Sequence, residues 1–359
     1  MAARSTSARL GVVALLVGVT SASAAPVDTA AIPKAAVWMM HLDMDAVRDS
    51  TVMRKIYERA ARMHPHLDKM MQMAAGMAGM DPRQDLQGVT AYGLDTDKRN
   101  AVVIVRAQAN REFLEKMVRK APDHATMEHG RHTLHRWTHK GWKRSQGEPV
   151  VGAFFKDDVM VFARTESQVR KALDVLDGDA DALGEGGPLA GRVRPGSILV
   201  ARAAAVDPET KCPVLRQGKS FRVAMGEHEG QSFYRALLDM KSEAAAGEVE
   251  NVVQGFTALA RLRWGDETAV MKLLGGLEVD TRGDTCKIAW DAPADGVWSV
   301  VEKAAESWEK RQRQWNRKRG GECEQCDREG CDGCEEGRCP MQKKDGGKKD
   351  RGPLRDDEF

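Results

Sequence analysis

The stretch "GVTAYGLDTDKRNAVVIVRA" at residues 88–107, followed by "NREFLEKMVRK" at residues 110–120, contains the local pattern on which the fold depends. Two runs rich in β-branched and aromatic residues flank a polar segment, which predicts two strands joined by a turn. The next segment has apolar residues at helical spacing and begins with Asn110, a residue type that favours helix initiation. The pattern therefore predicts a β-hairpin followed by a helix.

The same order recurs three more times along the chain. Hairpin patterns at residues 150–164, 221–240 and 276–290 are each followed by a helical pattern, at residues 165–176, 242–262 and 295–315. Tight turns join antiparallel strands, and a helix must bury its apolar side against another element. We therefore predict an α+β fold of antiparallel sheets covered by helices, built from four hairpin-then-helix units.

Each pair of units follows a lone strand, at residues 36–47 and 196–206. This order predicts an internal duplication, with halves at residues 33–190 and 195–305. The alternative is that hairpin plus helix is a common unit, and that four copies arose without duplication.

The N-terminus has the pattern of a secretion signal. Two arginines precede the apolar run "LGVVALLVGV" at residues 10–19, and Ala22 and Ala24 occupy the small positions of a cleavage site. The apolar run is about half the ~20 residues that a membrane-spanning helix needs. We expect a signal peptide over residues 1–24, a linker over residues 25–32, and a periplasmic or extracellular mature chain without a membrane span.

Net charge argues against a nucleic-acid partner. The full chain has 55 Lys and Arg and 53 Asp and Glu, and the first 24 residues contain two arginines and no acidic residue, which leaves 53 against 53. A protein that binds nucleic acid needs a surplus of basic residues to displace the counterions of phosphate.

Five of the seven cysteines lie in "CEQCDREGCDGCEEGRC" at residues 323–339. Paired C-x2-C motifs bring thiolates to one metal ion, so a zinc or copper site is predicted, with Cys323, Cys326, Cys331 and Cys334 as ligands and Cys339 as an alternate. An oxidising compartment equally favours disulfides, and an iron–sulfur cluster fits the spacing less well. Cys212 and Cys286 are expected either to pair with each other or to be buried free thiols.

Two softer clusters could also bind metal. In "GRHTLHRWTHK" at residues 130–140, His135 and His139 share one face of a predicted strand and could bind zinc or copper, although an exposed basic hairpin edge is the simpler interpretation. Met70, Met73, Met77 and Met80 recur at helical spacing. We expect this methionine stripe to pack in the core, and thioether ligation of Cu(I) is the alternative.

Enzyme motifs are weak. "PVLRQGKS" at residues 213–220 ends like a phosphate-binding loop, but Pro213 stands where the first glycine is needed. His41, Asp43 and Asp45 share one face of a predicted strand and could transfer protons or bind metal, although a strand end turning toward solvent is the simpler interpretation.

The C-terminal region has its own pattern. We expect a basic helical extension over residues 306–322 and a disordered charged tail over residues 340–359. Trp315 lies beyond the expected edge of the folded body and could dock a protein partner.

Three segments carry a resemblance to a known family: "VWMMHLDMDAVRDS" at residues 37–50, "GMDPRQDLQGVTAYG" at residues 79–93 and "VRKALDVLDG" at residues 169–178. Over about residues 35–300 the chain resembles a family of exported bacterial proteins of unknown function. The resemblance implies export and a shared α+β fold, and it brings no catalytic residues.

These observations favour an exported, non-enzymatic structural or binding module with an appended Cys-rich metal or disulfide element. A periplasmic protein that handles zinc or copper is the first alternative. An uncharacterised hydrolase that uses His41, Asp43 and Asp45 is the second.

Overall fold

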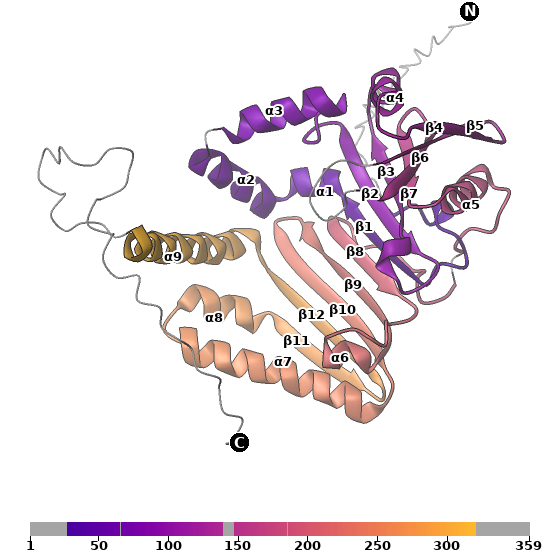
Figure 1. Cartoon of the computed structure of the whole chain (residues 1–359). Coiled ribbons are helices and arrows are strands. Elements are labelled where there is room, and N and C mark those ends of the chain that lie inside the picture. The colour runs from indigo at the N-terminus through magenta and orange to yellow at the C-terminus, as the bar shows by residue number, and fades with distance from the viewer. Residues whose placement is uncertain (1–26, 65, 139–146, 185, 321–359) are drawn as a thin grey trace, which may run out of the picture. The chain divides into compact units, whose positions relative to one another are not determined.

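A computed structural model describes residues 27–64, 66–138, 147–184 and 186–320. Twelve strands of this part form one antiparallel sheet, in the order β11–β12–β10–β9–β8–β1–β2–β3–β7–β6–β5–β4 (Figure 1). The strands are β1 (Trp38–Asp43), β2 (Leu86–Gly93), β3 (Val102–Ala107), β4 (Ala125–His129), β5 (His132–Thr138), β6 (Pro149–Lys156), β7 (Val159–Ala163), β8 (Ser197–Ala203), β9 (Gly218–His228), β10 (Gln231–Met240), β11 (Leu277–Arg282) and β12 (Thr285–Pro293).

Helices connect and cover these strands. They are α1 (Met44–Asp49), α2 (Thr51–Met63), α3 (Leu67–Ala78), α4 (Arg111–Arg119), α5 (Glu166–Asp177), α6 (Pro213–Arg216), α7 (Glu243–Trp264), α8 (Thr268–Gly275) and α9 (Ala294–Gly320), with short 3-10 turns η1 (Thr29–Ala31) and η2 (Lys98–Asn100). The α+β class is confirmed. No helix of the described ranges has the length and apolar character needed to cross a membrane.

All four predicted hairpins form, and each is followed by a helix: β2–β3 by α4, β6–β7 by α5, β9–β10 by α7 and β11–β12 by α9. Local chemistry explains two of the helix starts. The Asn110 side chain accepts a hydrogen bond from the Phe113 N–H at 2.9 Å. Thr165 and Gln168 form a reciprocal capping box at the start of α5.

The predicted antiparallel sheets are one continuous sheet, which contains the strands of both predicted halves. They join where β1 pairs with β8 in an antiparallel register, with Trp38 opposite Ala203 and Leu42 opposite Leu199. The strand order is the same on either side of this junction: β1–β2–β3–β7–β6 on one side and β8–β9–β10–β12–β11 on the other. The β4–β5 hairpin extends the first side. The duplication itself and the boundaries of its halves stay predictions.

The two sides of the sheet bury their cores on opposite faces. Met39 of β1 belongs to the first core, where Val169, Ala172 and Leu173 of α5 pack, and Met39 lies directly opposite Arg202 on β8. The second core packs α7 against Met240 and Cys286. Arg202 lies opposite Arg222, and Arg222 lies opposite Leu237, so Leu237 shares the face of Met39. Leu238, the ladder partner of Cys286, is the next residue along the strand and therefore points to the opposite face. The face that α5 covers on one side of β1 is therefore not the face that α7 covers on the other.

Of the described residues, those up to Val300 form one compact unit, and residues 301–320 belong to a second one. Helix α9 begins in the first unit, where Ala294 and Trp298 are buried, and continues to Gly320 in the second. Within the second unit, Trp308 and Trp315 are more than half exposed. The role of Trp315 in binding a partner stays a prediction.

Candidate anion-binding site

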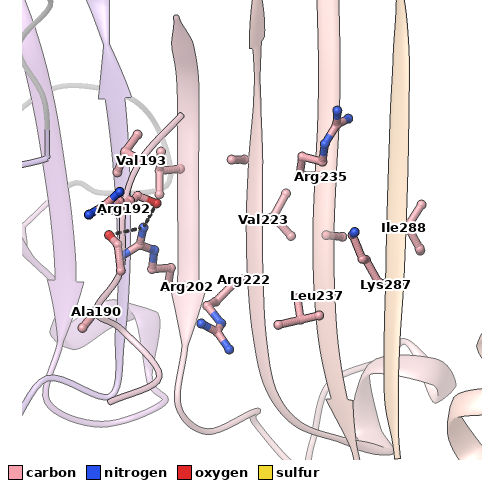
Figure 2. A pocket seen from close by; sticks show the side chains of 14 residues that line it. Ala190, Arg192, Val193, Arg202, Arg222, Val223, Arg235, Leu237, Lys287 and Ile288 are labelled. Atoms are coloured by element: carbon pink, nitrogen blue, oxygen red, sulfur yellow. Dashed lines mark hydrogen bonds between the residues drawn. The ribbon is translucent and has the colours of Figure 1, made fainter. Parts of the chain in front are cut away.

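A hollow of about 330 Å³ lies on the sheet face that α7 leaves uncovered (Figure 2). Its walls come from β8, β9, β10 and β12 and from the segment of residues 190–193. The residues that line it are basic or apolar, and none is acidic. They are Ala190, Gly191, Arg192, Val193, Val200, Arg202, Arg222, Val223, Ala224, Arg235, Ala236, Leu237, Lys287 and Ile288.

The register of the sheet explains why several basic residues share this face. Arg202 lies opposite Arg222, Arg222 opposite Leu237, and Leu237 opposite Lys287. Directly opposed residues of an antiparallel ladder point to the same side. One row across four strands thus carries three cations and a leucine, while Val200 and Ala224 form apolar parts of the floor in the next row on the same face.

Arg202 is already satisfied by the protein. It is 5% exposed, and its guanidinium donates to the carbonyl oxygens of Leu189 at 2.8 Å, Gly191 at 2.9 Å and Arg192 at 3.3 Å. Figure 2 shows the bonds to Gly191 and Arg192, which reach toward the 190–193 segment. Burial, and then the nearby charge of Arg222, lowers the pKa of Arg202. Arg202 therefore fixes the wall of the hollow and adds positive potential.

Arg235 is also engaged. Its guanidinium donates to the carbonyl oxygens of Tyr234 at 2.8 Å and Trp290 at 2.7 Å, and it forms an ion pair with Asp291. Asp291 additionally pairs with Arg194 at 3.4 Å. The charge of Arg235 is thus largely neutralised at the rim.

Arg222 and Lys287 differ from these two arginines, because neither forms an ion pair within the described ranges. The Nε atom of Arg222 is buried and has no hydrogen-bond partner there. The carboxylate opposite Lys287 on the ladder, Asp280, pairs instead with Arg282 at 3.1 Å. The Nε atom itself has no exposed surface, so an anion in the hollow would face the rest of the half-buried Arg222 guanidinium and the exposed Lys287 ammonium group.

The arrangement can bind an anion. Guanidinium and ammonium groups donate short, charge-assisted hydrogen bonds to phosphate and carboxylate oxygens. The Leu237 side chain lies between the two free cations on the ladder, so an apolar group can rest on it while an anionic group faces Arg222 or Lys287. The site therefore suits a small ligand with an anionic group on an apolar body.

The sites predicted from sequence fall elsewhere. Cys323, Cys326, Cys331, Cys334 and Cys339 lie outside the described residues, as does His139. His135 is buried, and it meets a partner that the sequence did not indicate: its Nδ1 lies 3.1 Å from Nε2 of His124, and the two rings stack. Burial lowers the pKa of His135.

His41 and Asp43 do not turn toward solvent; both are buried at 4% exposure. His41 Nδ1 lies 2.8 Å from the Thr90 hydroxyl, and the Asp43 carboxylate accepts the Ala46 N–H at 2.9 Å and so caps α1. Burial raises the pKa of Asp43. Asp45 pairs with Arg48. These contacts give the three residues structural roles at the end of β1.

The expectation of a methionine core was wrong for Met70 and Met73, which are 64% and 60% exposed. The side chain of Met77 lies outside the described ones. Cys212 and Cys286 are both free thiols, the first exposed and the second buried, and burial raises the pKa of Cys286. Across the described ranges, no three or more His, Cys, Asp and Glu side chains come together as a metal site.

Sequence reasoning missed the anion site. The available signal was an arginine in the middle of each of two apolar strands, in "ILVARAAAV" and "SFRVAM". Such a residue must find acceptors or solvent on its face of the sheet. The register that brings the two arginines together could not be read from either strand alone.

No family model matches the chain, and no curated protein matches it. Among solved structures, TP0453 in crystal form III is similar with a TM-score of 0.40 and 9% sequence identity, covering 78% of this chain and 99% of that chain. TP0453 in crystal form I gives a TM-score of 0.39 at 10% identity, covering 79% and 98%. Similarity at this level does not establish a shared fold, and the resemblance to exported bacterial proteins of unknown function stays a prediction.

Proposed function

We propose that this chain is an exported, non-enzymatic binding protein whose ligand is a small molecule with a phosphate or carboxylate group on an apolar body. The observation that carries the proposal is Arg222, a half-buried cation that forms no ion pair within the described ranges and lines a hollow without an acidic residue. Lys287 supplies a second free cation on the same row of the sheet.

The size of the hollow supports a small ligand. Pockets for small molecules are typically about 300–1,000 Å³ and mostly apolar with a few placed polar groups. A hollow of about 330 Å³ is at the low end of that range. It accommodates an anionic headgroup and part of a short chain, and the rest of a longer chain would extend along the open sheet face.

Export is proposed from the signal-peptide pattern of residues 1–24. A non-enzymatic role is proposed because the sequence carries no recognisable catalytic motif. Residues 323–339 add a Cys-rich element that binds zinc or copper or forms disulfides. Native mass spectrometry with metal analysis and thiol counting on the mature protein separates these two states of the element.

The test of the anion site is calorimetric titration of the mature protein with dodecyl phosphate. Neutralising both free cations in Arg222→Gln/Lys287→Gln removes charge-assisted bonds worth about 1.5–3 kcal/mol each, so binding is expected to weaken by at least about tenfold. Lys116→Gln/Lys120→Gln on and after α4 makes the same change in net charge on the other side of the sheet and is expected to leave binding unchanged.

A cationic amphiphile of the same chain length, dodecyltrimethylammonium, serves as the second control and is expected not to bind. Equal affinity of the wild type and the Arg222/Lys287 variant for dodecyl phosphate would refute the proposal. Equal binding of the cationic amphiphile would show that the apolar surface alone is responsible.

A further inference from the structure

Helix α3 exposes sulfur-containing side chains that a folded protein normally buries. Met70 and Met73 are 64% and 60% exposed, and His66 at the start of the helix is also exposed. Buried methionine fills gaps in cores, but these two thioethers fill none. Their exposure leaves both thioether sulfurs accessible to a ligand.

The three residues share one side of the helix. His66 is the N-cap of α3 and already has helical backbone angles, φ −87° and ψ −4°. The Met70 N–H donates to the His66 carbonyl at 2.9 Å, which closes the first turn. Positions 66, 70 and 73 are therefore spaced i, i+4 and i+7, and side chains at such spacing lie above one another on a helix surface.

Oxygen ligands near this turn are held in other contacts. The Asp68 carboxylate accepts the Tyr57 hydroxyl at 2.6 Å and pairs with Arg83 at 3.2 Å. The shared side carries one imidazole and two thioethers: the thioether sulfurs are soft ligands, and the imidazole nitrogen is a borderline one. Hard divalent cations such as Mg²⁺ and Ca²⁺ prefer oxygen, whereas Cu(I) and its redox-inert analogue Ag(I) prefer sulfur with imidazole.

We propose that His66, Met70 and Met73 form a binding site for a soft monovalent cation, Cu(I). The imidazole supplies one nitrogen ligand and the two thioethers supply the others. Methionine has three rotatable side-chain bonds, so both sulfurs can converge on one ion without a change in the helix. The proposal does not depend on the anion site on the sheet.

The rival explanation is that the methionines form an apolar docking surface. Leucine separates the two roles, because it preserves the apolar side chain and the helix propensity while removing the thioether. Met70→Leu/Met73→Leu is therefore the test variant. Met117→Leu, at an exposed methionine of α4, is the matched control.

The readout must distinguish this site from the thiols of residues 323–339. We would label the methionine methyl groups of the full-length protein with ¹³C and add Ag(I) until the thiols are saturated and beyond. The expected result is that the Met70 and Met73 methyl resonances and the His66 ring resonances shift together at one further equivalent, while Met117 does not shift.

In parallel, a colorimetric competition for Cu(I) counts the bound ions. The Met70→Leu/Met73→Leu variant is expected to lose one equivalent, His66→Gln to bind that equivalent at least about tenfold more weakly, and Met117→Leu to lose nothing. Circular dichroism checks that the variants keep their helix content. Unchanged Cu(I) stoichiometry in the leucine variant, or equal shifts at every exposed methionine, would overturn the proposal.

Discussion

Glu227 offers the sharpest test of how the two sides of the sheet hold the helices at the end of β1. It lies near the end of β9, and its carboxylate accepts the Thr51 N–H at 2.9 Å, the Val52 N–H at 3.2 Å and the Ser50 hydroxyl at 2.8 Å. Ser50 is the N-cap of α2, so the carboxylate binds the otherwise unpaired first N–H groups of that helix and faces the positive end of its dipole.

The perturbation is Glu227→Gln, which preserves the size and one acceptor oxygen but removes the charge. A hydrogen bond to a charged group contributes about 1.5–3 kcal/mol and one between neutral groups about 0.5–1.5 kcal/mol. The free energy of unfolding is therefore expected to fall by about 2–3 kcal/mol at pH 7, once a favourable carboxylate–dipole interaction is included.

The pH dependence gives an independent check. Burial alone would raise the pKa of Glu227. The hydrogen bonds from Thr51, Ser50 and Val52 together lower the pKa by a larger amount, so it lies below its ordinary value of 4.5. A carboxylate with a lowered folded-state pKa stabilises the fold above pH 4.5 and loses that contribution as the pH falls through its folded-state pKa. The difference between wild type and variant should thus be full at pH 7 and shrink toward pH 3.

The assay is urea unfolding at pH 7, 5 and 3, followed by circular dichroism. Glu229→Gln is the control, because Glu229 lies two residues away, is exposed, and has a long 3.9 Å contact with His228. A Glu227→Gln variant that unfolds at the wild-type urea concentration would refute the reasoning. A stability difference that is the same at pH 7 and pH 3 would show that charge is not responsible.

Three further predictions concern packing and reactivity. Gly226→Ala places a methyl group 2.0 Å from the carbonyl oxygen of Gly196, the residue just before β8, so it should lower the melting temperature sharply. Gly130→Ala has open space and should cost only about 1 kcal/mol for its positive φ, and thermal unfolding compares the two variants. Leu173→Ala empties a fully buried position of α5 and should reduce the free energy of unfolding by about 2–5 kcal/mol in urea titrations, and a smaller loss would contradict the packing described. Alkylation followed by peptide mass spectrometry should label Cys212 rapidly and Cys286 only after unfolding, since Cys286 is buried and its pKa is raised; equal rates would contradict this.

Local features of the fold were predictable from sequence. The four hairpins follow from alternating strands around polar turns, and the start of α5 follows from Thr165 and Gln168. The placement of β7 beside β3 and of β12 beside β10 was not predictable, because each hairpin folds back across an intervening helix. Nor was the single sheet, which depends on pairing between β1 and β8.

The same division applies to the sites. Helical spacing correctly placed Met70 and Met73 on one side of a helix, but spacing does not reveal whether another element covers that side. Arg202, Arg222 and Lys287 come from three strands, and only the register of the ladder places them in one row. The anion site therefore depends on long-range pairing that no single stretch of sequence encodes. The spacing of His66, Met70 and Met73 is local, and only their exposure was not predictable.

The β1–β8 junction also determines the order in which the chain can fold. Hairpin partners such as β2 and β3 are close in sequence and pair quickly. Strand β1 must wait for β8, from which residues 44–196 separate it. During that interval one edge of β1 is open, and open edges accept strands from other chains. A β8 strand from a second copy would offer the same register and the same hydrogen bonds. Synthesis at high concentration is thus expected to produce strand-exchanged pairs of chains, in which every native pairing is kept but each β1–β8 junction joins strands of two molecules.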